Sequence, residues 1–143
     1  MERVGLDWVV VGFDVSGSID KRECDAFIAQ LELLRDESPA NKITIVPFNH
    51  VIQRDQIKDI HDGEEIPKKF RVGGGTSFDS FINWVNRQKE IPDSVIIFTD
   101  LGDCSYGTEP ECPVMWASSY PVYVNGSYSN KPPFGDVVEI EID

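Results

Sequence analysis

The sequence predicts an α/β fold with a mostly parallel central sheet of about six strands, including one short antiparallel edge strand. Helices are expected on its faces, and the C-terminal third is expected to be helix-poor. Short apolar, β-branched runs, clearest at Trp8–Gly12 and Val95–Phe98, are separated by amphipathic helical patterns. Both runs lead to an aspartate, Asp14 or Asp100. The length of 143 residues suits a single domain over residues 1–143.

The first half of the chain begins with a clear alternation of strand and helix patterns. Residues 8–14 predict the first strand, and apolar residues then recur at helical spacing over residues 19–34. Residues 42–48 predict a second strand from their β-branched content. A short return strand is expected within residues 51–57, followed by a charged, irregular segment over residues 58–72.

Both predicted helices begin at recognisable signals. Asp20 and Glu23 have the spacing of a capping box at the start of the first helix. The second helix follows the loop Gly73–Thr76, so its N-terminal end presents Thr76 and free backbone N–H groups. Its apolar face is predicted to consist of Phe78, Phe81, Ile82 and Val85.

The last third of the chain predicts strands without crossover helices. Residues 94–100 form the clearest buried strand, and residues 114–117 and 137–142 predict two more. The last of these alternates apolar and acidic residues, as a strand with one wet face does. The intervening stretches 101–112 and 120–135 are rich in Gly, Ser, Pro, Asn and Tyr and show no helical period.

Charge and composition restrict the class of partner and the location. The net charge is −12, with 25 acidic residues against 13 basic ones, so a basic nucleic-acid-binding surface is not expected. The first strand begins within a few residues of Met1, with no basic leader or long apolar stretch. We therefore expect neither secretion nor a membrane span, and a cytoplasmic location.

The three cysteines are an odd number at no zinc-like spacing, which suits a reducing compartment. They are Cys24, Cys104 and Cys112. A Cys104–Cys112 bridge, or a zinc ion shared with His50 or His61, remains an alternative.

Five oxygen-bearing side chains are expected at one edge of the sheet. Alternate residues of an extended segment point the same way, so Asp14, Ser16 and Ser18 can converge while Gly17 permits the turn between them. Ligands of open α/β sheets bind at the carboxyl ends of strands, where the winding order reverses. If strands 8–14 and 94–100 are neighbours there, Thr76 and Asp100 join the group. Separate roles as helix caps or an Asx turn are the alternative for each residue.

These residues resemble a known family. Asp14-x-Ser16-x-Ser18, Thr76 after a Gly-rich loop, and Asp100 in Phe98-Thr99-Asp100 resemble the metal-ion-dependent adhesion site (MIDAS) of von Willebrand factor type A (VWA) domains. Nearly the whole chain resembles the VWA-like domain that often follows a metallopeptidase-like region, through the motifs Gly73–Thr76, Pro113–Trp116 and Pro133–Val138. Two positions depart from that pattern: Ser77 stands where an acidic residue is frequent, and Leu101 stands in place of the usual Gly.

The resemblance implies a Rossmann-like sheet with Mg²⁺, or Mn²⁺, at its top and a role in protein binding without catalysis. The implied metal site consists of Asp14, Ser16, Ser18, Thr76 and Asp100. A cation held by three neutral hydroxyls and two carboxylates stays electron-poor, so it can accept an Asp or Glu of a partner protein. By analogy with related VWA proteins, we expect that partner to be an AAA-type ATPase or a larger assembly.

A contact rim is expected around this site, because an ion alone is too small for a specific interface. The predicted rim consists of Asn49, His50, Gly74, Gly75, Leu101, Asp103 and Tyr106. The tyrosines of the helix-poor loops are the available aromatic anchors, and the alternative is that they only cover the sheet. They are Tyr106, Tyr120, Tyr123 and Tyr128.

An enzyme is the alternative from a different class. An aspartate after the first strand and acids after a later strand also describe haloacid dehalogenase-like phosphatases, with Asp14 as nucleophile. That chemistry commonly places a second acid two residues later, where this chain has Ser16, which cannot protonate a leaving group. A third alternative, an acidic mimic of nucleic acid, leaves the ordered five-residue pattern unexplained.

Overall fold

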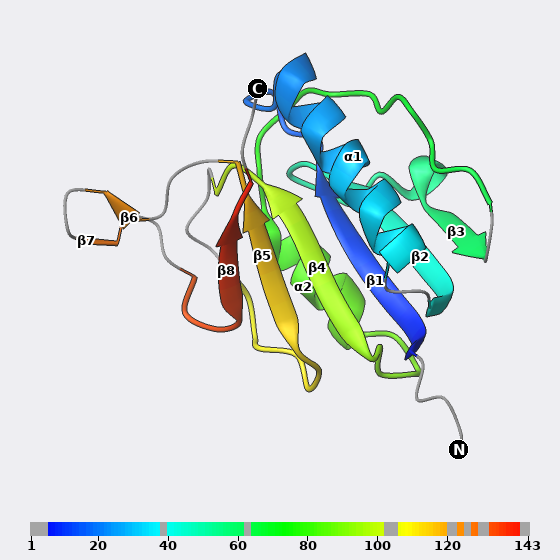
Figure 1. Ribbon diagram of the computed structural model, residues 1–143. Helices are drawn as coiled ribbons and strands as arrows, with labels where there is room; N and C mark the ends of the chain where they lie inside the picture. Colours follow the sequence, from blue (N-terminus) through cyan, green and yellow to red (C-terminus); the bar gives the residue numbers. More distant parts are fainter. Residues whose placement is uncertain are drawn as a thin grey trace.

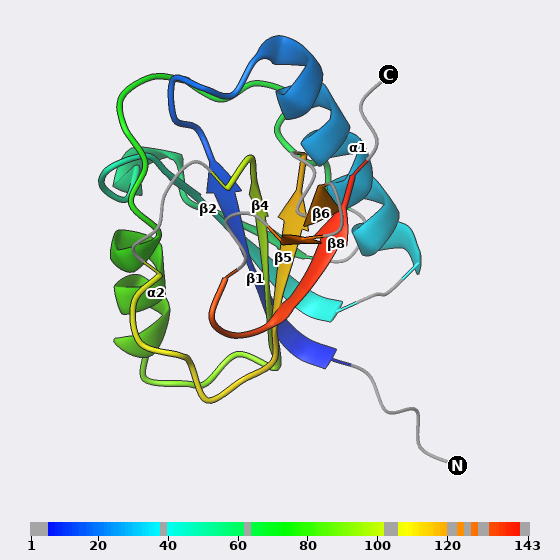
Figure 2. The ribbon, with the colours of Figure 1, turned by 90° about the vertical axis from the view of Figure 1, so that its left-hand side faces the viewer.

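A computed structural model describes residues 6–37, 40–61, 64–101, 106–119, 123–124, 127–128 and 132–140. Its centre is a six-stranded sheet in the order β3-β2-β1-β4-β5-β8, with α1 on one face and α2 on the other (Figure 1, Figure 2). A separate two-stranded ribbon, β6-β7, lies beyond β8 (Figure 1). The elements are β1 (Leu6–Asp14), α1 (Lys21–Glu37), β2 (Ala40–Phe48), η1 (Arg54–Gln56), β3 (Lys58–His61), α2 (Phe78–Asn86), β4 (Ser94–Thr99), β5 (Val114–Ser118), β6 (Tyr123–Val124), β7 (Ser127–Tyr128) and β8 (Asp136–Glu139).

The sheet confirms the predicted fold class. All neighbouring strands pair in parallel except β2 and β3, so β3 is the short antiparallel edge strand. The central strand β1 lies between β2 and β4, and its residues Val9, Val10 and Val11 are buried because the sheet is covered on both faces. In the described part of the chain no helix follows α2, as the helix-poor composition predicted.

Helix α1 begins with the predicted capping box. The Asp20 Oδ1 accepts a hydrogen bond from the Glu23 N–H (2.8 Å), and the Glu23 Oε1 accepts one from the Asp20 N–H (3.2 Å). The helix buries Phe27 and Leu31 against Phe13 and the rest of one core cluster. Its capping group is therefore Asp20, which leaves the hydroxyl of Ser18 outside that role.

Helix α2 covers the opposite face and buries its four predicted apolar residues, including Phe81. Its N-cap is Ser77, whose Oγ accepts a hydrogen bond from the Ser80 N–H (3.3 Å). Thr76 therefore precedes the cap. Among the described residues, neither helix has the length and apolar character needed to cross a membrane.

The return strand predicted within residues 51–57 is reduced to one antiparallel bridge, from Phe48 to Ile52, and the strand itself lies at Lys58–His61, in the segment predicted to be irregular. The ladder with β2 begins only at Lys58, which pairs with Ile45. The reason is a turn at Asn49, whose Oδ1 accepts a hydrogen bond from the Val51 N–H (3.1 Å) and so turns the chain locally before η1. Three of the four residues of β3 are exposed, and only Ile60 is buried, which explains its charged sequence.

The last strand differs in detail from its prediction. Strand β8 covers Asp136–Glu139, and residues 141–143 lie outside the described residues. The predicted alternation puts Val138 and Ile140 on the apolar face; Ile140 packs against the core cluster beneath α1, but Val138 is 45% exposed. Val137 instead packs against the core cluster beneath α2. Both faces of this edge strand therefore contribute some apolar contact, and neither is fully covered.

The packing between β1 and α2 predicts a strong response to one added methyl group. A Cβ at Gly12 would lie 2.8 Å from Cζ of Phe81, a buried ring that stacks on Phe48. We expect Gly12→Ala to lower the free energy of unfolding by about 1–3 kcal/mol, as overpacking of a core typically does. Urea denaturation would measure it. Gly73→Ala is the matched control, because a Cβ there meets nothing within 4 Å. Equal stability of the two variants would contradict this packing.

Candidate functional site

The carboxyl ends of β1 and β4 are adjacent, as the sequence predicted. Phe13 pairs with Phe98, and each strand then ends within one residue, at Asp14 and Thr99. The chain leaves β1 through α1 toward β2 on one side, while β4 lies on the other side. This is the point at which the winding order reverses, where ligands of open α/β sheets bind.

Asp14 is the buried centre of this edge, with no exposed surface. Its Oδ1 accepts a hydrogen bond from the Ser16 N–H (2.9 Å), and its Oδ2 accepts one from the Thr99 hydroxyl (2.6 Å). The Thr99 Oγ1 in turn accepts the Leu101 N–H (3.0 Å). The carboxylate is therefore held in one orientation from both sides. Sequence reasoning missed Thr99, whose only signal is a hydroxyl next to Asp100 at the end of a buried strand.

The two serines of the motif lead from this buried carboxylate toward the surface. Their Oγ atoms lie 3.1 Å apart, so the hydroxyls of Ser16 and Ser18 converge as the alternating pattern predicted. Ser16 is buried and Ser18 is exposed. Three oxygen-bearing groups thus extend from the interior to solvent within one turn.

The glycine-rich loop is fastened directly to the turn after β1. The Gly73 N–H donates to the Val15 carbonyl (2.8 Å), and the Gly17 N–H donates to the Gly74 carbonyl (2.8 Å). These two bonds bring the loop that carries the half-buried Thr76 against the Asp-x-Ser-x-Ser turn. Gly74 has φ +78°, a left-handed backbone conformation that favours glycine.

Asn49, predicted on the contact rim, fastens this loop to the end of β2. Its Nδ2 donates to the Gly73 carbonyl (3.0 Å), and its backbone carbonyl accepts the Ser77 N–H (2.9 Å). Its Oδ1 accepts hydrogen bonds from the Val51 N–H (3.1 Å) and the Gln53 side chain (3.0 Å). The amide of Asn49 is thus used in hydrogen bonds within the domain, and its described role is to position the loop.

The segments that carry all five predicted ligands therefore meet at one edge, although their role as ligands stays a prediction. In the described residues no group of three or more His, Cys, Asp and Glu is placed to hold a metal, so a zinc site of that kind is not found there. The predicted donor set is different, with two carboxylates and three hydroxyls, and such oxygen donors fit Mg²⁺. The five residues are Asp14, Ser16, Ser18, Thr76 and Asp100.

The electrostatics of the edge also fit a cation. Burial raises the pKa of the Asp14 carboxyl, and the nearby negative charge of Asp100 raises it further, while hydrogen bonds from Thr99 and Ser16 lower it. The burial effect is the largest of these. A cation at this edge would offset both unfavourable effects, because it favours the ionised form of each carboxylate.

The predicted rim is only partly placed at the surface. His50, Gly74 and Gly75 are exposed next to one another, and a Cβ at Gly74 would lie 3.2 Å from His50 Nδ1. Leu101, in contrast, is only 1% exposed, so its predicted contact role is wrong. Its φ of 58° directs the side chain into the core beneath α2. Asp103 lies outside the described residues.

Tyr106 packs against the core, which favours a structural role over the predicted aromatic anchor. Its ring stacks on Phe78 at 5.3 Å and meets Trp116 edge-on at 5.3 Å. Tyr120 and Cys104 lie outside the described residues. Tyr123 and Tyr128 pair through their backbones in β6-β7. Cys24 and Cys112 are free, buried thiols.

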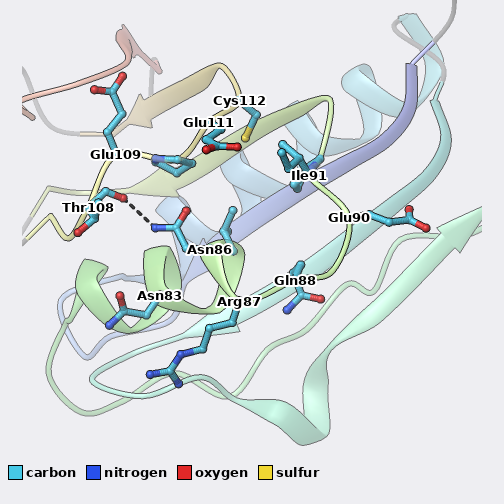
Figure 3. Close-up of a pocket in the computed structure, with 13 residues that line it drawn as sticks. Asn83, Asn86, Arg87, Gln88, Glu90, Ile91, Thr108, Glu109, Glu111 and Cys112 are labelled. Carbon is cyan, nitrogen blue, oxygen red and sulfur yellow. Dashed lines mark hydrogen bonds between the residues drawn. The ribbon is translucent and has the colours of Figure 1, made fainter.

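A cavity of about 540 Å³ lies at the other end of α2, away from the predicted site. Figure 3 shows polar side chains from the C-terminal part of α2 and from residues 108–112 around it, with Asn86 donating a hydrogen bond to the Thr108 carbonyl (2.9 Å). Arg87 and Glu90 extend in different directions. Their charges do not converge on one point, and none of the predicted site residues lines this cavity.

The raised pKa of Asp14 predicts that its charge costs stability when no metal is bound. Since the folded-state pKa lies above the unfolded one, this group stabilises the fold at low pH and loses that contribution as pH rises through the folded pKa. Asp14→Asn removes the charge, and its amide can still accept from the Ser16 N–H and donate to Thr99 Oγ1. We expect a higher melting temperature than wild type in EDTA at neutral pH, with a smaller difference at acidic pH.

Circular dichroism melts over a pH series would measure this difference. Asp93→Asn is the matched control, because Asp93 is exposed and its Oδ2 accepts hydrogen bonds from the Asp7 and Trp8 N–H groups (2.8 and 2.9 Å). Loss of that charge should not stabilise the domain. A metal-free Asp14→Asn protein less stable than wild type at neutral pH would refute the argument.

Comparison with known proteins agrees with this fold. The family model described as VWA-like domain (DUF2201) matches residues 9–141. The crystal structure of the conserved hypothetical protein BatB from Bacteroides thetaiotaomicron superposes with a TM-score of 0.59 and 14% sequence identity, over 96% of this chain and 91% of that one. No curated protein matches. Since the family model spans nearly the whole chain, the chain belongs to the family of VWA-like domains.

Proposed function

We propose that this domain binds a partner protein by docking one of the partner's Asp or Glu side chains on a divalent cation at the β1–β4 edge. The observation that carries the proposal is the buried carboxylate of Asp14, fixed by two hydrogen bonds at the point where the winding order reverses. Membership of the VWA-like family supports a protein-interaction module. We propose that the module acts without catalysis.

The residues that would hold the cation would contribute different chemical groups. Asp14 and Asp100 provide the negative charge, directly or through water, while the hydroxyls of Ser16, Ser18 and Thr76 are neutral donors. A bound Mg²⁺ or Mn²⁺ would supply the positive charge that attracts the partner's carboxylate. Three of the five donors are neutral hydroxyls, and a carboxylate that acts through water is not a direct ligand, so the cation could still accept the partner's carboxylate.

The negative charge of the domain would confine an acidic partner segment to the β1–β4 edge. The protein carries a net charge of −12, so an acidic segment is repelled by most of its surface and attracted only where a cation offsets that charge. His50, Gly74 and Gly75 are the exposed part of the rim. We propose a cytoplasmic protein partner, an AAA-type ATPase or a larger assembly, and neither nucleic acid nor membrane as the target.

The phosphatase alternative gains no support from the family match or the fold match. That chemistry commonly places a second acid two residues after the nucleophile, and this chain has Ser16 there, which cannot protonate a leaving group. The binding module is therefore the proposal that we retain.

Metal binding should stabilise the domain. At a Mg²⁺ concentration a hundredfold above Kd, linkage predicts about 2.7 kcal/mol of added stability, which is a rise of roughly 5–10 °C in melting temperature for a domain of this size. Asp14→Asn should abolish this rise while keeping the fold. Differential scanning fluorimetry with MgCl₂, MnCl₂ and EDTA would measure it. An equal rise in wild type and Asp14→Asn would show that the ion binds elsewhere.

Partner capture should depend on the metal and on the glycine-rich loop. We expect immobilised domain to retain a specific protein from an extract of the source cells in Mg²⁺ and to release it in EDTA. Thr76→Ala should weaken both this capture and the Mg²⁺-induced stabilisation, because the variant loses one donor. Thr108→Ala, an exposed threonine outside the predicted site, is the control. Capture that persists in EDTA would exclude a metal-mediated contact.

A further inference from the structure

A cavity of about 400 Å³ adjoins the predicted metal site, between the first turn of α1 and the segment that leads into the glycine-rich loop. That segment crosses the end of the sheet beside α1 in both views (Figure 1, Figure 2). Ile19 of one wall directly follows Ser18, and Val72 of the other directly precedes Gly73. The turn and the loop of the predicted site therefore continue into the two walls of this cavity. We name it the Ile19 pocket.

The floor of the Ile19 pocket is apolar. Ile19 and Cys24 are buried, and the half-buried ring of Phe70 stacks on Phe13 at 4.4 Å, which anchors this wall to the core. Val72 is 43% exposed, so an aliphatic side chain at the cavity wall still meets solvent. Covering these groups would remove apolar surface from water, which favours binding of an apolar side chain.

The rim of the Ile19 pocket is close to neutral, in contrast to the protein as a whole. Three lysines and two aspartates line it, whereas the whole chain carries a net charge of −12. Lys21 pairs with Asp25 (2.7 Å), and Lys68 pairs with Glu32 of α1 (3.1 Å). Lys69 is exposed and makes no ion pair with any residue that the structure describes. An acidic segment is therefore tolerated here better than on most of the surface.

We propose that the Ile19 pocket holds an aliphatic side chain of the same acidic partner segment whose carboxylate docks at the β1–β4 edge. This inference rests on the proposed function and specifies its partner: a segment with an Asp or Glu and a Leu-like residue a few positions away. The volume lies within the range of ligand pockets, about 300–1,000 Å³. An interface needs such a buried apolar anchor besides its ionic contact, and the ring of Tyr106 is already packed on Phe78 and Trp116.

The probe is a set of fluorescent Gly/Ser peptides that carry one Asp and one Leu at increasing spacing. Matched peptides replace Leu by Ser, or Asp by Asn. Fluorescence anisotropy with excess MgCl₂, and again with EDTA, gives their affinities. At the best spacing we expect the Leu peptide to bind at least about tenfold more tightly than its Ser counterpart, because a buried Leu side chain contributes that much or more.

Val72→Glu should remove the tenfold preference for Leu, because it places a charge at the apolar wall. Ile91→Glu is the matched control: it also replaces an exposed aliphatic residue by an acid, but Ile91 is 60% exposed and lies outside this pocket. Val72→Glu should retain the Mg²⁺-induced rise in melting temperature, which shows that the variant is folded and that its metal site is intact. Methyl NMR of Ile19 and Val72 provides a direct signal from the pocket.

The outcomes separate this inference from the proposed function. Mg²⁺-dependent binding of the Asp peptides with no preference for Leu, or with a preference that survives Val72→Glu, overturns the inference and leaves the proposed function intact. If no peptide binds in a Mg²⁺-dependent way, the proposed function is refuted. The methyl NMR signals then test the Ile19 pocket on their own. Shifts of Ile19 and Val72 methyl groups with the Leu peptide in EDTA would support the pocket, and unchanged signals would overturn it.

Discussion

The buried carboxylate of Asp14 is the constraint on which the architecture of this edge depends. A charge removed from water is strongly unfavourable, and here the hydrogen bonds from the Ser16 N–H and the Thr99 hydroxyl reduce that cost without removing it. Both donors are available only if the turn after β1 is tight and if β4 lies directly beside β1. The pairing of β1 with β4 and the orientation of the Asp14 side chain therefore depend on each other.

The rest of the edge is built around that requirement by backbone hydrogen bonds. Asn49 connects the end of β2 to Gly73, and the loop from Gly73 is bonded to the turn after β1. Three segments that are distant in sequence are thereby joined by groups that carry no net charge. Hydroxyl and amide groups can position a site without adding to the repulsion that two nearby carboxylates, Asp14 and Asp100, already create.

Sequence alone predicted the features that follow from local pattern. The β-branched runs predicted the parallel strands, the capping box predicted the start of α1, and the rule that parallel strands finish at one edge brought Asp14 and Asp100 together. Prediction from the sequence failed where a side chain redirects the backbone. The turn made by Asn49 delays the return strand to Lys58, and no periodicity reports such a turn.

The rim was harder to predict than the arrangement of the strand ends, for a related reason. Residue type does not say which way a loop residue points, and burial of Leu101 and packing of Tyr106 depend on the path of the chain after β4. Thr99 was missed because a threonine at the end of a buried strand is ordinary on β propensity alone. Its importance appears only when its partner across the strand pair, Asp14, is known.

In the described residues no helix follows α2, so part of the sheet face beside α1 is left uncovered. Where a further helix would cover β5 and β8, a groove of about 230 Å³ remains, lined in part by Leu33, Met115 and Val138. These three side chains are between 39% and 46% exposed. The sheet is therefore well shielded around β1 and less so toward β8, so the best-packed region supports the predicted metal site.

Leu101 gives that site an unusual rigidity. A left-handed conformation costs a residue other than glycine roughly 1–2 kcal/mol, whereas burial of a leucine side chain contributes roughly 1.5–3 kcal/mol. Burial is the larger effect, so the side chain holds the backbone beside Asp100 in place, and a glycine would hold it less firmly. Any rearrangement of this loop would have to withdraw Leu101 from the core. Such an edge would be preorganised for the proposed cation and poorly suited to act as a conformational switch.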